Sequence, residues 1–67
     1  MLFVIKDKSD RPVGRVEDGG EIKDMNGRHL GQWDSDGDLF NSSGNKVTRL
    51  DRCAAKAGEA YYLVGGN

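Results

Sequence analysis

A chain of 67 residues and 7.3 kDa has room for one small domain, residues 1–67, with a single core. Hydrophobic residues make up 36% and charged residues 31%, and ten Lys and Arg against eleven Asp and Glu leave a formal charge of −1. This balance argues against a nucleic-acid partner, because nucleic-acid-binding domains concentrate positive charge on one face.

The longest apolar run covers residues 1–5, whereas a membrane-spanning helix needs about 20 apolar residues. The run also lacks a basic start and a cleavage site, so we expect no signal peptide, no membrane partner and a cytoplasmic location. Cys53 is the single cysteine, so the fold must stand without an internal disulfide.

A spacing of seventeen residues organises the sequence. Apolar, glycine and acidic or amide positions recur at this spacing: Val13, Leu30, Val47 and Val64; Gly14, Gly31 and Gly65, with Thr48 in place of the third Gly; Ile5, Ile22 and Leu39; Asp7, Asp24 and Asn41; Val16, Trp33 and Leu50; Gly20 and Gly37. Four units of seventeen span 68 positions, one more than the chain has. The sequence therefore predicts four copies of one element.

Each unit is predicted to be a β-hairpin, since short segments of mixed polarity are bounded by turn residues. In the first unit Pro12 follows the turn and cannot donate to the ladder, so we expect local irregularity there. In the second unit Asn26-Gly27 predicts a two-residue type I′ turn that places Ile22 opposite Gly31, and Ser43-Gly44 fills the same place in the third.

The connections between hairpins are predicted to be three-residue turns. At residues 35–37 such a turn places Leu39 across from Trp33 and keeps the apolar columns on one face. Its third position needs a left-handed backbone, and Gly20 and Gly37 occupy that position in the two connections.

This pairing predicts two apolar faces. The first is the core: Phe3, Ile5, Val16, Ile22, Trp33, Leu39 and Leu50, with Gly14 and Gly31 letting neighbouring side chains lie across the backbone. The second is a candidate interaction face: Val13, Met25, Leu30, Val47, Tyr62 and Val64. A chain of this size can rarely leave so much apolar surface in water, so we expect a homo-oligomer that covers the second face.

The fold class expected from these features is all-β, with four pseudo-symmetric antiparallel hairpins of about 17 residues closed into a small ring. Closure would bring residues 61–64 beside residues 2–5 and hide both sheet edges. The fourth unit departs from the pattern, because residues 52–57 are rich in Ala and lack the expected turn Gly. A helical turn near residues 51–57 and a strand are both open there, with a strand resuming over residues 60–64.

The columns above, with their Asp-x-x-Gly turns and Val-Gly-Arg or Leu-Gly-Gln strands, resemble the four-fold β-flower family of small bacterial domains. The resemblance covers almost the whole chain and implies four hairpins about a pseudo-four-fold axis. It implies no activity, cofactor or site residue.

His29 and Cys53 are the candidate reactive side chains. The predicted pairing sets His29 opposite Asp24, which is either a cross-strand polar pair or, less simply, a catalytic base. Cys53 is interpreted as a small semi-buried residue, and if exposed it could bridge two copies. No nucleophile, acid and base set is visible, so we expect neither an enzyme nor any catalytic residue.

Residues 34–38 form the densest acidic cluster, and their spacing fits a turn better than a calcium loop, so we expect no metal and no cofactor. Trp33 is expected in the core, and one of the adjacent Tyr61 and Tyr62 should meet solvent. The function favoured is a non-enzymatic structural or protein-interaction module that self-associates, its protein partner unidentified. The alternative is a small module that binds a glycan, a peptide or a cation.

Overall fold

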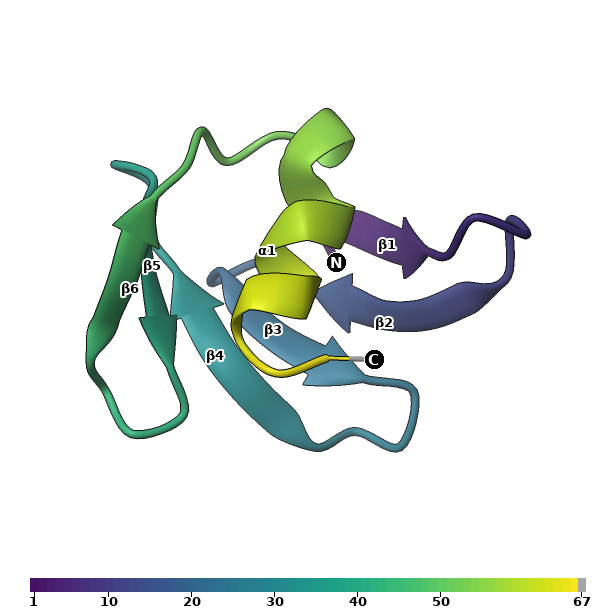
Figure 1. Cartoon of the computed structure of the whole chain (residues 1–67), viewed down its shortest axis with the longest axis horizontal. Coiled ribbons are helices and arrows are strands. Elements are labelled where there is room, and N and C mark those ends of the chain that lie inside the picture. Colours follow the sequence, from purple (N-terminus) through teal and green to yellow (C-terminus); the bar gives the residue numbers. More distant parts are fainter. Residues whose placement is uncertain (67) are drawn as a thin grey trace.

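A computed structural model describes residues 1–66 of the chain (Figure 1). The elements are, in chain order, β1 (Phe3–Lys6), β2 (Pro12–Val16), β3 (Glu21–Asp24), β4 (His29–Trp33), β5 (Asp38–Asn41), β6 (Lys46–Arg49), the 3-10 helix η1 (Ala54–Lys56) and the helix α1 (Ala57–Leu63). No helix within residues 1–66 combines the length and apolarity needed to cross a membrane.

The six strands form one antiparallel sheet in sequence order, from β1 at one edge to β6 at the other. The predicted β-rich, hairpin-built architecture is thereby confirmed. The predicted ring is wrong, because within residues 1–66 the sheet is open and three of the four predicted hairpins form. The chain after β6 turns back as η1 and α1, and α1 packs beside β1 (Figure 1).

All five connections between consecutive strands use the same three-residue turn. The residue before each turn donates its N–H to the carbonyl four residues later, over 2.8–3.1 Å, as Asp34 does to Asp38. The third turn residue has a positive φ in every case: Asp10, Gly20, Gly27, Gly37 and Gly44. The expected three-residue turns between hairpins, with Gly20 and Gly37 left-handed, are confirmed, as is the pairing of Trp33 with Leu39.

The turn within the second hairpin differs from the prediction. It spans residues 25–27 and is not the two-residue Asn26-Gly27 turn. Ile22 nevertheless pairs with Gly31 as predicted, because the register skips Leu30 and so compensates for the extra turn residue. Val13 and Val47 are skipped in the same way in the other two hairpins.

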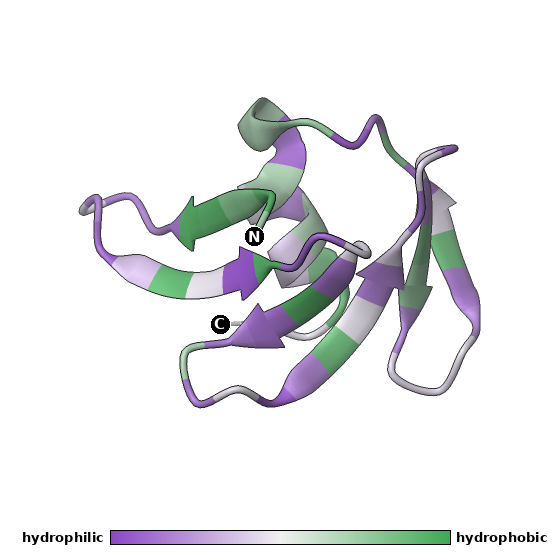
Figure 2. Ribbon diagram, turned by 180° about the vertical axis from the view of Figure 1, so that it is seen from behind, coloured by the Kyte–Doolittle hydropathy of each residue, from purple (hydrophilic) through white to green (hydrophobic). Residues whose placement is uncertain are grey.

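The predicted core face is confirmed. Side chains from β1 to β5 that are almost completely buried form its centre, and Phe3 and Leu50 pack against them: Ile5, Val16, Ile22, Trp33 and Leu39. Figure 2 shows the alternation of hydrophilic and hydrophobic residues along the strands that produces this single buried face. The indole Nε1 of Trp33 donates to the Leu50 carbonyl at 2.8 Å, so the largest core side chain also makes its one hydrogen bond.

Helix α1 completes the core. Its residues at positions i, i+3, i+4 and i+7 are buried, as expected of a helix with one apolar face: Ala57, Ala60, Tyr61 and Val64. Tyr61 and Val64 lie over Gly14 and Gly31, where an added Cβ would come within 2.6 Å and 2.8 Å of them. The prediction that these glycines let side chains cross the backbone is confirmed, and the side chains belong to the helix.

The strand predicted over residues 60–64 is wrong, since these residues are helical or cap the helix. Three substitutions at the repeat spacing account for this. Ala54 stands where Gly20 and Gly37 supply a positive φ, Lys56 stands in the column of core apolar residues, and Gly58 replaces the Asp or Asn before the turn. A fourth hairpin would therefore be strained at its entry, charged in its core and uncapped at its turn.

Candidate functional site: a groove between the first hairpin and the helix

An apolar groove of about 370 Å³ lies between the end of the first hairpin and α1. Its apolar lining is Ile5 of β1, Val13 of β2 and three residues of α1, namely Gly58, Tyr61 and Tyr62. Its rim is polar, with Lys6, Asp7 and Lys8. A concave apolar surface with a few polar groups at its edge is the usual form of a binding site.

The inner side of the groove is fixed by Tyr61. This ring is buried over Gly14, and its hydroxyl donates to the carbonyl of Val13 at 2.9 Å. Val13 is the residue that the β1–β2 register skips, so the hydrogen bond ties the helix to the bulge of the first hairpin. The two elements that border the groove are thereby held together.

The outer side of the groove is open. Tyr62 is 75% exposed, although it follows the buried Tyr61 directly. Gly58 has no atom within 4 Å of the position of an added Cβ, so the groove beside it is unfilled. The expectation that one of the two tyrosines meets solvent is confirmed. Successive residues of a helix point about 100° apart, so one tyrosine can be buried while the next is exposed.

The rim carries an uneven distribution of charge. The carboxylate of Asp7 is committed to its own turn, since Oδ1 accepts the N–H groups of Ser9 and Arg11 at 2.9 and 3.0 Å. These backbone hydrogen bonds, that of Arg11 first, hold the pKa of Asp7 below its usual 3.8. Lys6 reaches Asp10 at 3.6 Å, and Lys8 makes no ion pair among the described residues. The rim therefore offers the ammonium group of Lys8 to an incoming group.

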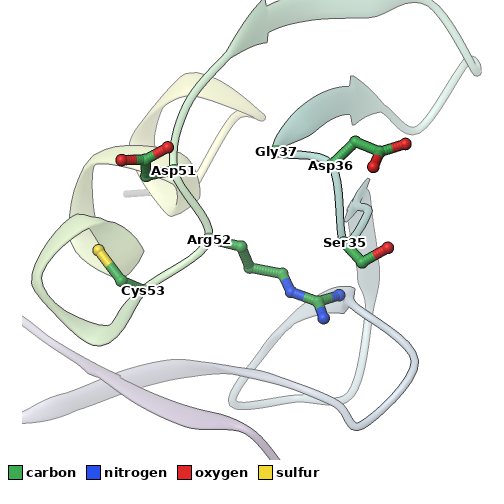
Figure 3. Close-up of a pocket in the computed structure, with 6 residues that line it drawn as sticks. All are labelled: Ser35, Asp36, Gly37, Asp51, Arg52 and Cys53. Carbon is green, nitrogen blue, oxygen red and sulfur yellow. The ribbon is translucent and has the colours of Figure 1, made fainter.

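A second cavity, of about 430 Å³, lies between the turn at 35–37 and residues 51–53 (Figure 3). Arg52 extends across it, while the side chains of Asp36, Asp51 and Cys53 point away from the guanidinium. Nη1 of Arg52 donates to the Trp33 carbonyl at 3.1 Å. Arg52 is thus engaged in joining the segment after β6 to the sheet, and we assign no site here.

The six residues of the predicted interaction face are divided by the fold. Leu30 and Val64 belong to the chain's own core, and Val13 packs against that core, so a separate second face is wrong for them. Met25, Val47 and Tyr62 are exposed, on a turn, on β6 and on α1 respectively. The bulges at Val13 and Leu30 turn these residues away from strict alternation, and Val64 is buried because it ends the helix.

His29 pairs with Glu21 and not with Asp24. Its Nδ1 lies 2.7 Å from Oε2 of Glu21, since the three-residue turn moves His29 one place along the ladder. This hydrogen bond is the main cause of a pKa of Glu21 below its usual 4.5. Asp24 instead accepts two backbone N–H groups of its own turn, which lowers its pKa. The pair is on the exposed face of the sheet and borders neither cavity.

Cys53 is exposed, so its interpretation as a semi-buried residue is wrong. In the acidic cluster, Oδ1 of Asp34 accepts the N–H groups of Asp36 and Asp38 at 3.0 and 2.9 Å, which confirms its role in the turn. Among residues 1–66 no three His, Cys, Asp or Glu side chains are grouped to hold a metal.

Sequence reasoning missed the groove because it placed residues 60–64 in a strand. The signal was present in the spacing of Ala57, Ala60, Tyr61 and Val64, which is helical. With that helix in place, Gly58, Lys6 and Lys8 become neighbours of one apolar opening.

A family model described as "Protein of unknown function (DUF3659)" matches residues 4–56, which cover η1 and the six strands except Phe3, the first residue of β1. The chain has no significant match among the curated proteins or the solved structures.

Proposed function

Because the chain belongs to the DUF3659 family of unknown function, we propose from its geometry that it is a non-enzymatic protein-interaction domain. Its docking surface is the side formed by β1 and α1. One observation carries the proposal: five of the seven large exposed hydrophobic residues within residues 1–66 lie on β1, just before it, or on α1, namely Met1, Leu2, Val4, Tyr62 and Leu63.

Exposed apolar side chains on adjacent elements are typical of surfaces that bind other proteins, whereas scattered ones need no explanation, and of these five Tyr62 also lines the groove. Tyr62 adds to this, since tyrosine is enriched at protein interfaces, where its ring is buried and its hydroxyl stays wet. By contrast Met25 and Val47 stand apart, on a turn and on the opposite edge strand.

The non-enzymatic part of the proposal rests on how the reactive groups are used. His29 hydrogen-bonds Glu21 on an exposed face, Asp7, Asp24 and Asp34 cap turns, and Arg52 holds a backbone carbonyl. Asp7 and Arg52 border the two cavities but are held by these contacts, and His29, the single histidine, lies at neither cavity.

The homo-oligomer was expected because Leu30 and Val64 were assigned to a second apolar face. Both are buried inside the chain, so this argument no longer holds. A second copy remains one of the proteins that could dock on the β1 and α1 side. Of the alternative ligands, a peptide is favoured by the apolar groove.

A photo-reactive residue tests the proposal directly. p-Benzoylphenylalanine in place of Tyr62 should cross-link a partner protein when the chain is irradiated in its native cells, and the same residue in place of Val47 should not. Both positions are exposed, at 75% and 37%. An adduct of twice the chain mass would identify a second copy. Equal labelling from both positions, or no adduct from position 62, would contradict the proposal.

A further inference from the structure

β1 is the terminal strand of an open sheet, so it pairs with β2 on one side only. An unpaired strand edge presents backbone N–H and C=O groups that another extended chain can use. At the other edge, β6 carries Lys46 and Arg49, which are both exposed, as is typical of an edge protected against pairing. β1 is the more apolar edge, and its C-terminal end extends past α1 (Figure 1).

The alternation of β1 determines what a strand added there would present. Ile5 faces the core and lines the groove, so the residue opposite Ile5 would point into the groove between β1 and α1. The next residues, opposite Val4 and Lys6, would point to the outer face. Val4 is 45% exposed and offers an apolar neighbour, and Lys6 offers a cation.

The groove is large enough for one bulky side chain, and Gly58 leaves its far wall open. At the rim beside it Asp7 pairs with Arg11 and Lys6 with Asp10, which leaves Lys8 as a cation with no ion-pair partner among the described residues. Charge complementarity therefore favours a carboxylate in the occupant, next to the side chain that enters the groove.

We infer that β1 and the groove bind an extended segment of a partner protein by strand addition. The segment runs antiparallel to β1. From its N-terminus it has one or two acidic residues, then a bulky apolar residue in the groove, then a β-branched residue beside Val4. The inference rests on the proposed function, because it names the chemistry of the partner for the same β1 and α1 side.

A phage-displayed library of random heptapeptides tests this inference on the immobilised full chain. Gly58→Phe should block the groove, while the matched control Gly58→Ala leaves it open and favours the helix. We expect wild type and Gly58→Ala to enrich acidic, bulky apolar, β-branched peptides. A synthetic copy of the enriched peptide should bind Gly58→Phe at least about tenfold more weakly, as expected when a buried anchor loses its pocket.

Two further measurements separate the elements of the inference. The double variant Lys6→Glu, Lys8→Glu changes only exposed side chains and should weaken the peptide about fivefold or more, with the difference shrinking at high salt. Two versions of the peptide, each methylated on one of the two alternating sets of backbone nitrogens, should differ. The version whose methyl groups replace the N–H groups that face β1 should not bind, because strand addition depends on those N–H groups.

The outcomes distinguish this inference from the proposed function. Enriched peptides that lack the acidic residue, or that bind equally well in both N-methylated forms, would overturn strand addition of an acidic segment and leave a docking groove. Failure to enrich any peptide sensitive to Gly58→Phe would overturn the inference. The cross-link from position 62 does not depend on the sequence of the bound peptide. Absence of that cross-link overturns the proposed function whatever the peptide experiments show.

Discussion

Residues 1–50 and residues 51–66 carry the same spacing of seventeen but fold differently, as three hairpins and as a short helix. In the hairpins the turn glycines, the side-chain caps and the core apolar residues recur together. In the last segment Ala54, Lys56 and Gly58 replace one of each. The difference teaches that a few turn and core positions decide whether a repeated spacing gives a repeated structure.

The two regions also depend on one another. The hairpins leave a core face that an open six-stranded sheet does not cover, and α1 covers it with Ala57, Ala60, Tyr61 and Val64. The helix has only seven residues, too few to be stable alone in water. The helix is therefore stabilised by packing on the sheet, where Tyr61 and Val64 lie over Gly14 and Gly31.

The largest expected effect is on the core that the two regions share. Trp33→Ala should lower the free energy of unfolding by about 3–5 kcal/mol, because it removes a fully buried side chain and leaves a cavity. A domain of this size has roughly 3–10 kcal/mol in total, so the variant should lose from about a third to all of its stability. Urea denaturation followed by circular dichroism measures this. Val47→Ala, on an exposed side chain, is the control and should stay within about 0.5 kcal/mol.

The contact between helix and sheet is tested by Gly31→Ala. The new Cβ would lie 2.4 Å from the carbonyl oxygen of Phe40 in β5 and 2.8 Å from Cγ1 of Val64, so the β4–β5 backbone and the helix must both shift. We expect a loss of about 1–3 kcal/mol, with amide hydrogen exchange rising in α1 before it rises in β2 and β3. Gly19→Ala, where nothing lies within 4 Å, should leave exchange unchanged. Uniform exchange across both regions would show that they unfold as one unit.

The role of the turn glycines can be measured by copying the fourth unit into the third. Gly37→Ala reproduces the Gly-to-Ala change found at Ala54, and its φ of +94° disfavours any Cβ by about 1–2 kcal/mol. Its Cβ would also lie 3.0 Å from the Leu50 carbonyl oxygen, so the loss should exceed that of Gly44→Ala, which has no such contact. Thermal unfolding compares the two. Gly44→Asp should be the mildest change, since Asp10 adopts this conformation in the first hairpin.

The smallest effect concerns the carboxylates that cap the turns. The pKa of Asp24 is lowered from 3.8 in the folded chain, so its contribution to stability is present above that value and is lost as the pH falls through the lower, folded pKa. Asp24→Asn should remove this acid dependence and keep the turn, because Asn41 accepts the same two backbone N–H groups with an amide oxygen. Asp24→Ala should lack the two side-chain hydrogen bonds of the turn at every pH. Urea titrations between pH 2 and 6 distinguish the three proteins.

Much of the sheet could be predicted from the sequence, because its pattern is local. The positive φ of Gly20 and Gly37 and the pairing of Trp33 with Leu39 follow from turn length and alternation. The bulge at Val13 lies beside Pro12, where local irregularity was expected, but the bulges at Leu30 and Val47 were not predictable in this way. An extra turn residue and a skipped strand residue cancel, so the pairing of Ile22 with Gly31 is the same with or without them.

The helix and the groove were harder to predict, since they depend on contacts distant in sequence. Tyr61 and Val64 have strand-forming side chains, and their packing on Gly14 and Gly31 favours the helical alternative. The pairing of His29 with Glu21 follows from the extra residue in the turn, which the sequence pattern did not reveal because the bulge compensates for it. Burial of Leu30 in the core likewise requires the register to be known.

The single tryptophan of the chain offers a spectroscopic consequence. Trp33 is completely buried in the sheet, and its indole N–H is hydrogen-bonded to Leu50, the residue at which the chain leaves β6 for its helical end. Detachment of that end would break this bond and admit water to the indole while the hairpins persist. The wavelength of intrinsic fluorescence emission therefore reports on the junction of the two regions without any label.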